Sequence, residues 1–184
     1  PNGIRASVTD SGMLTKMRES GCLHVTLAPE TGSERVLKEI IEKGKDFDLA
    51  QLKDCGALAH NLGLKVAAYF IIGLPGETRS EVQETINYAK ELAKCGIDEV
   101  AFGLFIPLPG TPLWKVAKKK NQEMDFLDLL AVGDMNKAVS WNDYMDAEEL
   151  NSLRLKAYIG FHLTRMIYHP LLFMKSFFNV MLNI

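Results

Sequence analysis

The sequence predicts an α/β protein with parallel strands, and three features of the chain support that prediction. An amphipathic helix, a closing glycine and a short apolar run follow one another three times within the 184 residues. The apolar runs are nearly continuous, as expected for parallel strands that are buried on both faces. Strands that alternate with helices of this length form βαβ units with right-handed crossovers.

The three repeats place helices over residues 13–20, 49–62 and 82–95, and these precede strands over residues 23–28, 64–72 and 99–106, respectively. Gly21, Gly63 and Gly96 stand between each helix and its strand. A glycine at this point supplies the left-handed residue that ends a helix. The three helices are therefore expected to end at these glycines.

One further helix is expected over residues 33–44, with Gly44 closing it. Two of the helix starts are marked by capping residues. Asp48 with Gln51 and Ser80 with Gln83 both have the spacing of a capping box, before the second and the third repeat. Helix boundaries are therefore predicted at both ends of the longer helices.

The composition is that of an ordinary globular protein and excludes several classes of function. Hydrophobic residues make up 47% of the chain, and 21 basic against 23 acidic residues give a net charge of −2. That balance gives no electrostatic case for nucleic acid as a partner. The three cysteines are far apart in the sequence, which excludes a disulfide framework and a CxxC metal site. No signal peptide is visible, so we expect a cytoplasmic protein.

Three short loops rich in glycine and proline follow the three strands: APETGSE at 28–34, GLPGET at 73–78 and PLPGTP at 107–112. Because ligands bind at the carboxyl ends of parallel strands, these loops are expected to form one site. The Glu30 carboxylate either accepts hydrogen bonds from a sugar diol or caps the helix that begins near Ser33. Gly73 and Gly76 either let the backbone approach a ligand or serve a plain tight turn.

Three segments, in order, resemble the radical S-adenosylmethionine (SAM) enzymes: GCLHVTLAPETGSERVLKEIIEKG, KVAAYFIIGLPGET and AFGLFIPLPGTPLW. The resemblance covers residues 2–116 and implies an incomplete (β/α)6 TIM-like barrel. It also implies S-adenosylmethionine and a four-iron, four-sulfur cluster at the carboxyl ends of the strands. In this family the reduced cluster cleaves the cofactor, and the resulting radical abstracts hydrogen from a substrate.

The chain departs from the family pattern in one decisive respect. The family's cluster ligands lie in a CxxxCxxC loop, and no such spacing exists among Cys22, Cys55 and Cys95. The glycine-rich motif of the family's second strand is also absent. The resemblance therefore implies a C-terminal portion of the barrel over residues 1–135 and a helical extension over residues 136–184. Such a fragment is expected to be inactive by itself, with the cluster ligands outside the chain and no catalytic or metal-ligating residue within it.

The resemblance carries seven cofactor-binding candidates over to this sequence: Glu30, Ser33, Lys43, Ile71, Gly73, Ile106 and Pro107. Glu30 matches the glutamate that approaches the cofactor ribose, and Lys43 matches a basic residue that either pairs with the cofactor carboxylate or is a solvated helix-end lysine. The candidates from the second and third strands match positions beside the adenine. Thr31 replaces the usual serine and Pro29 an isoleucine-type residue, which leaves the shape of the first loop open.

The C-terminal segment differs from the rest of the chain. Residues 148–170 resemble the segment that follows the domain in the branch with an N-terminal cobalamin-binding domain, which implies cobalamin in the larger protein. Residues 171–184 form an apolar stretch too short to span a membrane. We expect it to pack on protein and to cause self-association.

Two other classes of function remain as alternatives. An aldolase- or isomerase-type barrel would need a catalytic residue at a strand end, but Lys65 lies at the start of its strand. A non-catalytic scaffold module would use the apolar tail for docking. The sequence indicates no particular small-molecule substrate.

Overall fold

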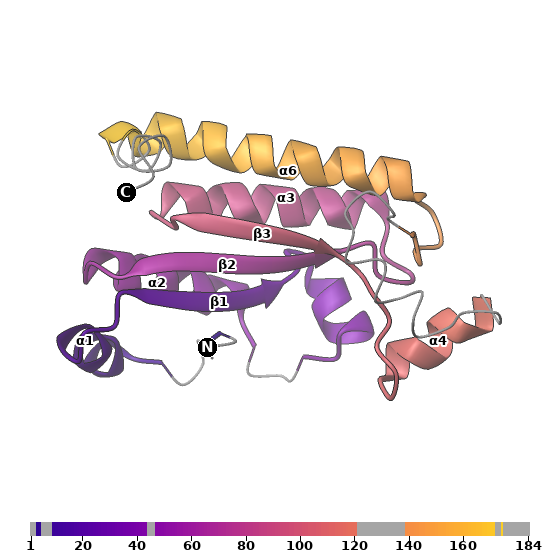
Figure 1. Cartoon of the computed structure of the whole chain (residues 1–184), viewed down its shortest axis with the longest axis horizontal. Coiled ribbons are helices and arrows are strands. Elements are labelled where there is room, and N and C mark those ends of the chain that lie inside the picture. The colour runs from indigo at the N-terminus through magenta and orange to yellow at the C-terminus, as the bar shows by residue number, and fades with distance from the viewer. Residues whose placement is uncertain (1–2, 5–8, 44–46, 121–138, 172–173, 175–184) are drawn as a thin grey trace.

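A computed structural model describes residues 3–4, 9–43, 47–120, 139–171 and 174 (Figure 1). Within these residues, three parallel strands form one sheet in the order β1 (His24–Glu30), β2 (Lys65–Ile72) and β3 (Glu99–Leu104). The prediction of an α/β fold with parallel strands is confirmed. Ile4 pairs in parallel with Leu27 on the other side of β1, and its N–H donates to the Thr26 carbonyl over 2.8 Å.

The helices are α1 (Ser11–Glu19), a π-helix η2 (Val36–Ile40), α2 (Leu49–Asn61), α3 (Arg79–Lys94), α4 (Pro112–Lys120) and α6 (Ala147–Tyr168). Gly21, Gly63 and Gly96 have φ angles of 89°, 78° and 90°, as predicted for residues that end helices. Asp48 caps α2 by accepting a hydrogen bond from the Ala50 N–H over 2.7 Å.

Several predicted boundaries were wrong. The first strand runs to Glu30, two residues beyond its predicted end at Ala28. The capping box of α3 consists of Thr78 and Glu81 and not of Ser80 and Gln83, because the Glu81 carboxylate reaches back to the Thr78 N–H over 2.8 Å. The helix predicted to end at Gly44 is a π-helix in its last part and ends at Ile40. Two residues later, Glu42 takes a left-handed φ of 55°, so the helix does not continue to Gly44. The third strand ends at Leu104, two residues early, and the chain then turns towards α4.

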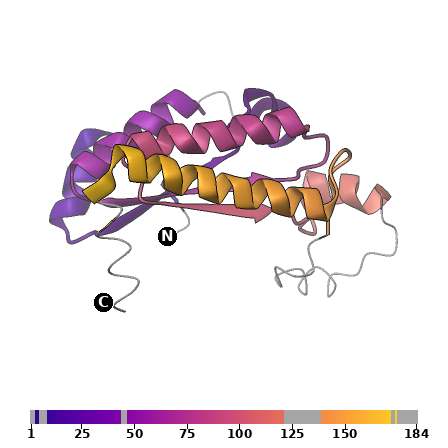
Figure 2. The same cartoon turned by 90° about the horizontal axis from the view of Figure 1, so that it is seen from above.

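Helices α2, α3 and α6 pack against one face of the sheet (Figures 1 and 2). Alternate strand residues point to these helices, among them Leu27, Phe70 and Phe102, and the last two rings stack with centroids 5.0 Å apart. Tyr69 points to the opposite face and is 48% exposed. The helical face therefore carries the main hydrophobic core.

The long C-terminal helix α6 lies beside α3 and covers the edge of β3 (Figure 2). The Phe102 N–H at this edge donates to the Tyr158 hydroxyl over 3.0 Å, which satisfies a backbone group that an edge strand leaves unpaired. Near the other end of α6, Arg165 is 3% exposed and pairs with Asp98 over 2.9 Å.

Among the described helices, none combines the length and the apolar character that crossing a bilayer requires. Most of the predicted apolar tail, residues 172–173 and 175–184, lies outside the described part of the chain.

Candidate functional site

The carboxyl ends of the three strands lie at the same edge of the sheet, where all three arrowheads point (Figure 1). A cavity of about 280 Å³ opens at this edge. Its lining includes Glu30 from β1, Ile71 from β2, Phe105 just after β3 and Leu113 from α4. The loops that follow different strands therefore share one cavity with mainly apolar walls.

Glu30 occupies an irregular end of β1. The pairing of β1 with β2 shifts register between Leu27 and Glu30, and Glu30 takes a left-handed φ of 68°. This conformation is uncommon for residues other than glycine and costs free energy. Within the described residues, the Glu30 carboxylate pairs with Lys43 over 3.3 Å and accepts no hydrogen bond from the following helix. The capping alternative thus finds no support in the geometry.

The loop after Glu30 is fixed to α3 by Thr85. The Thr31 and Thr85 hydroxyls are 2.8 Å apart, and the Gly32 N–H donates to the Thr85 hydroxyl over 2.9 Å. A Cβ atom on Gly32 would lie 2.7 Å from the Tyr88 Cβ, so only glycine fits. Ser33 is 2% exposed in this loop, and its N–H donates to the Thr31 hydroxyl. Ser33 is therefore buried within this loop and does not line the cavity.

Arg35 connects the loop after β1 to the loop after β2. Its guanidinium binds both carboxylate oxygens of Glu81, over 2.5 and 2.7 Å, and donates to the Gly76 carbonyl over 2.8 Å. The hydrogen bonds to Arg35 lower the pKa of Glu81 to about 2, although burial opposes the shift. The sequence analysis missed this pair, because its members are 46 residues apart and have no local signature.

Glu77 is fully buried beneath the turn that follows β2. One carboxylate oxygen accepts hydrogen bonds from the Gly73 and Leu74 N–H groups over 2.6 and 3.1 Å. The other oxygen has no hydrogen-bond partner among the described residues. Burial raises the pKa of Glu77 to about 7, although the two N–H groups oppose the shift. The only signal in the sequence was an acidic residue within the GLPGET loop.

Gly73 has a left-handed φ of 82°, and a Cβ at this position would lie 2.7 Å from Leu150 in α6. The glycine therefore permits a close approach to α6 rather than to the cavity. A segment from the C-terminal part of the chain holds the same turn. The Asn142 amide donates to the Leu74 and Glu77 carbonyls over 2.7 Å each, and Asp143 accepts from the Gly76 N–H over 2.6 Å.

The seven candidates are thus only partly brought together. Glu30 and Ile71 line the same cavity, and Lys43 pairs with Glu30. Ile106 packs in a small cluster that also contains Phe105 and Trp141. Pro107 is buried beyond the end of β3, and neither it nor Ile106 lines the cavity. From this part of the chain Phe105 lines the cavity, and the assignment of Ile106 and Pro107 to the cofactor stays a prediction.

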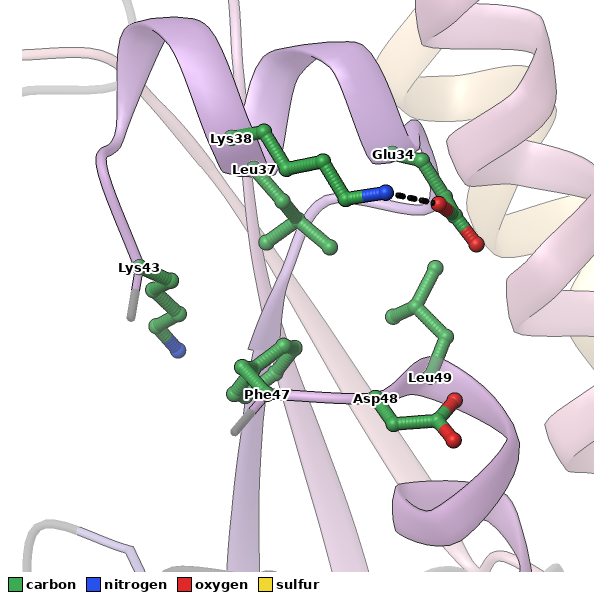
Figure 3. A pocket seen from close by; sticks show the side chains of 7 residues that line it. All are labelled: Glu34, Leu37, Lys38, Lys43, Phe47, Asp48 and Leu49. Atoms are coloured by element: carbon green, nitrogen blue, oxygen red, sulfur yellow. Dashed lines mark hydrogen bonds and ion pairs between the residues drawn. The ribbon is translucent and has the colours of Figure 1, made fainter. Parts of the chain in front are cut away.

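A second cavity of about 640 Å³ lies between η2 and the start of α2 (Figure 3). Its lining is mixed in charge: Glu34, Leu37, Lys38, Lys43, Phe47, Asp48 and Leu49. Glu34 and Lys38 pair across one side, and the Lys43 ammonium lies 4.2 Å from the centre of the Phe47 ring. Lys43 therefore lines this cavity while its ammonium contacts Glu30 of the first.

Of the two expected groups, S-adenosylmethionine and a four-iron, four-sulfur cluster, the described residues fit the first. Mainly apolar walls with the carboxylates of Glu30 and Glu42 among the lining residues suit an adenosyl group, whose base is flat and apolar and whose ribose carries a diol. The cysteines do not suit an iron–sulfur cluster, because Cys22 and Cys95 lie at the amino edge and Cys55 is buried in α2. Burial also raises the pKa of the Cys55 thiol. Among the described residues, no cluster of histidine, cysteine and acidic side chains could hold a metal ion.

Comparison with known proteins agrees with this geometry. The sequence pattern of the Radical SAM superfamily matches residues 1–89, which include Glu30, Lys43 and the whole GLPGET loop. The chain belongs to the radical SAM superfamily. The match ends within α3, so the loop after β3 lies beyond it.

The relatives of this radical SAM chain include several enzymes. It is 34% identical over 161 residues to an uncharacterized methyltransferase of Pyrococcus horikoshii, covering 86% of this chain and 33% of the relative. It is 35% identical over 119 residues to cytidylyl-2-hydroxyethylphosphonate methyltransferase of Streptomyces wedmorensis, covering 61% and 21%. It is 26% identical over 167 residues to anaerobic magnesium-protoporphyrin IX monomethyl ester cyclase of Rubrivivax gelatinosus, covering 89% and 28%. The chain thus spans between about a fifth and a third of the length of these relatives.

Proposed function

We propose that the carboxyl-edge cavity binds the adenosyl part of S-adenosylmethionine, and that the chain is the C-terminal portion of a (β/α)6 radical SAM barrel. The observation that supports the site is the position of Glu30, a carboxylate held at the rim of a cavity whose walls include Ile71 and Phe105. A carboxylate accepts hydrogen bonds from both hydroxyls of a diol. The apolar side chains would contact the adenine and exclude water from it.

The seven candidates have different parts in this proposal. Glu30 binds the ribose, Ile71 contacts the base, and Ile106 and Pro107 shape the chain beside Phe105. Lys43 pairs with the Glu30 carboxylate. Gly73 and Ser33 act indirectly: Gly73 leaves room for Leu150 of α6, and the Ser33 N–H bonds Thr31, whose hydroxyl contacts Thr85 of α3. Bound beside a reduced four-iron, four-sulfur cluster, S-adenosylmethionine supplies a radical that abstracts hydrogen from a small-molecule substrate. We propose that the cluster ligands lie outside these 184 residues, so that the chain alone does not turn over.

The names of two relatives support a narrower proposal. Both are called methyltransferases, and the C-terminal segment resembles the cobalamin-associated branch. We infer that the whole protein transfers a methyl group and uses cobalamin. The division into residues 1–135 and 136–184 and the self-association of the chain stay predictions. The outward face of α6 is consistent with self-association, since Leu155, Ile159 and Leu163 are at least half exposed.

The test is the variant Glu30→Ala in the whole protein. Loss of charge-assisted hydrogen bonds to the ribose is expected to raise the S-adenosylmethionine dissociation constant about 10- to 150-fold, which corresponds to about 1.5–3 kcal/mol. Isothermal titration calorimetry measures the constant, and the melting temperature is recorded in parallel. Glu34→Ala is the matched control, because Glu34 is an exposed carboxylate nearby that does not line this cavity. A lower melting temperature with an unchanged dissociation constant would refute the ribose assignment.

A further inference from the structure

The end of β1 contains an extra residue. Leu27 pairs with Ala68 and Glu30 with Phe70, so three steps along β1 match two steps along β2. This is the geometry of a β-bulge, which disrupts the ladder locally and redirects a side chain. Pro29 lies inside the bulge and has no N–H to donate. The backbone that presents Glu30 is therefore held by fewer ladder hydrogen bonds than the rest of the strand.

Lys43 supplies contacts at this point. Its ammonium donates to the Ala28 carbonyl over 2.6 Å and lies 3.3 Å from a Glu30 carboxylate oxygen. An ammonium group has three donors, so one lysine can hold a backbone carbonyl and a carboxylate together. The Phe47 ring, 4.2 Å from the ammonium, limits its freedom further. The Lys43 and Glu30 side chains are each 24% exposed, so the pair is partly shielded from water.

We propose that Lys43 is a positioning residue that sets the bulge and orients the Glu30 carboxylate, an inference that rests on the proposed function of Glu30. The Lys43 ammonium contacts Ala28 and Glu30 of β1, and Lys43 does not line the cavity that Glu30 and Ile71 share. Its contribution to binding therefore reaches the ligand through Glu30. This role differs from the expected pairing of Lys43 with the carboxylate of the cofactor's amino-acid tail.

Two ligands distinguish these roles. S-adenosylmethionine carries adenine, ribose and the amino-acid tail, whereas 5′-methylthioadenosine keeps adenine and ribose but has no carboxylate. In the whole protein, Lys43→Met is expected to weaken both ligands by the same factor, about tenfold, because the ribose contact is common to both. A loss for S-adenosylmethionine alone would overturn the proposal and assign Lys43 to the tail. Unchanged affinity for both ligands would overturn it as well.

Further variants separate positioning from folding. Lys43→Arg keeps a cation at the site and is expected to lose less affinity than Lys43→Met. Lys38→Met is the matched control, since this lysine of η2 pairs with exposed Glu34 and not with Glu30. Combined with Glu30→Gln, Lys43→Met should cause no further loss, because residues that act through one contact are not additive. If Glu30→Gln itself leaves both affinities unchanged, the proposed function fails. If Glu30→Gln weakens both ligands but the Lys43 variants leave both affinities unchanged, the proposed function stands and only the positioning role of Lys43 fails.

Discussion

The two edges of the sheet differ in which residues take left-handed backbone. At the amino edge, Gly21, Gly63 and Gly96 take positive φ where helices end, and glycine does so without steric cost. At the carboxyl edge, Gly73 and Gly76 also take positive φ, but so do two residues with side chains, Glu30 and Glu42, with φ angles of 68° and 55°. A left-handed residue with a side chain costs about 1–2 kcal/mol. The amino edge therefore favours stability, whereas the carboxyl edge accepts strain where it presents a carboxylate.

Buried charge differs between the edges in the same way. Arg165 and Asp98 form a buried pair at the amino edge. At the carboxyl edge, Glu77 is buried with one oxygen unpartnered among the described residues, and Glu81 needs Arg35 from another loop. If this contrast holds, variants at the amino edge should change stability and leave ligand affinity alone. The following predictions test it.

The largest effect on stability is expected at the amino edge from Arg165→Ala. Removing the guanidinium leaves the partly buried Asp98 carboxylate without its charged partner, with the Val66 N–H as its remaining donor, and breaking a buried pair costs about 3–5 kcal/mol, of which we expect the lower end here. Urea denaturation measures the free energy of unfolding. Lys156→Ala on the exposed face of the same helix is the control and should change it by less than about 0.5 kcal/mol. A loss below about 1 kcal/mol for Arg165→Ala would contradict the contrast.

The next effect is a pH dependence caused by Glu77. Its pKa of about 7 in the folded state exceeds the ordinary value of 4.5, so the folded protein retains a proton that the unfolded chain has released. The contribution of Glu77 to stability should therefore fall as pH rises from about 4.5 to 7, by about 3 kcal/mol in total, and that contribution is constant outside this range. Glu77→Gln should remove this fall. Urea unfolding curves at several pH values measure the free energy of unfolding. The control Glu34→Gln should show the same decrease with pH as the unmodified protein.

A smaller effect is expected from Thr85→Val. This substitution keeps the shape of a fully buried side chain but removes the hydroxyl that contacts Thr31 and the Gly32 N–H. Leaving these buried groups unsatisfied should cost about 1–3 kcal/mol and should weaken S-adenosylmethionine binding through the loop that carries Glu30. Thr15→Val in α1 also removes a hydroxyl, but one that bonds the exposed Ser11 carbonyl. Equal losses for both variants would show that the carboxyl-edge loop has no special role.

The smallest effect is expected from Gly63→Ala. Its φ of 78° is left-handed and the nearest atom to an added Cβ is 3.6 Å away, so backbone strain alone should cost about 1 kcal/mol. The melting temperature measures this loss, and the affinity for S-adenosylmethionine should stay the same. An equal or higher melting temperature would mean that the amino edge does not depend on glycine as the comparison requires.

Much of the architecture follows from short-range patterns in the sequence. The apolar runs predict the three strands, and the glycines predict where α1, α2 and α3 end. Of the predicted capping box of Asp48 and Gln51, the N-cap Asp48 is confirmed, because its hydrogen bond reaches only two residues along the chain, whereas no bond from the Gln51 side chain is found among the described residues. That Glu30 and Ile71 meet at one edge follows from the parallel order of the strands. Such patterns do not predict the π-helix or the early end of β3, because both depend on segments that are adjacent in space but distant in the sequence.

The sequence by itself therefore determined the fold class, the edge that carries the site and the carboxylate at its rim. Only the tertiary structure decided how that edge is held. Arg35 binds Glu81, which is 46 residues away in the sequence, and Asn142 donates to the Leu74 carbonyl, which is 68 residues away. It likewise decided that Gly73 faces Leu150 and that Lys43 turns to Glu30. Helix and strand patterns arise from the periodicity of neighbouring residues. These contacts depend instead on which polar groups become buried when distant segments pack together, because a buried polar group needs a hydrogen-bond partner.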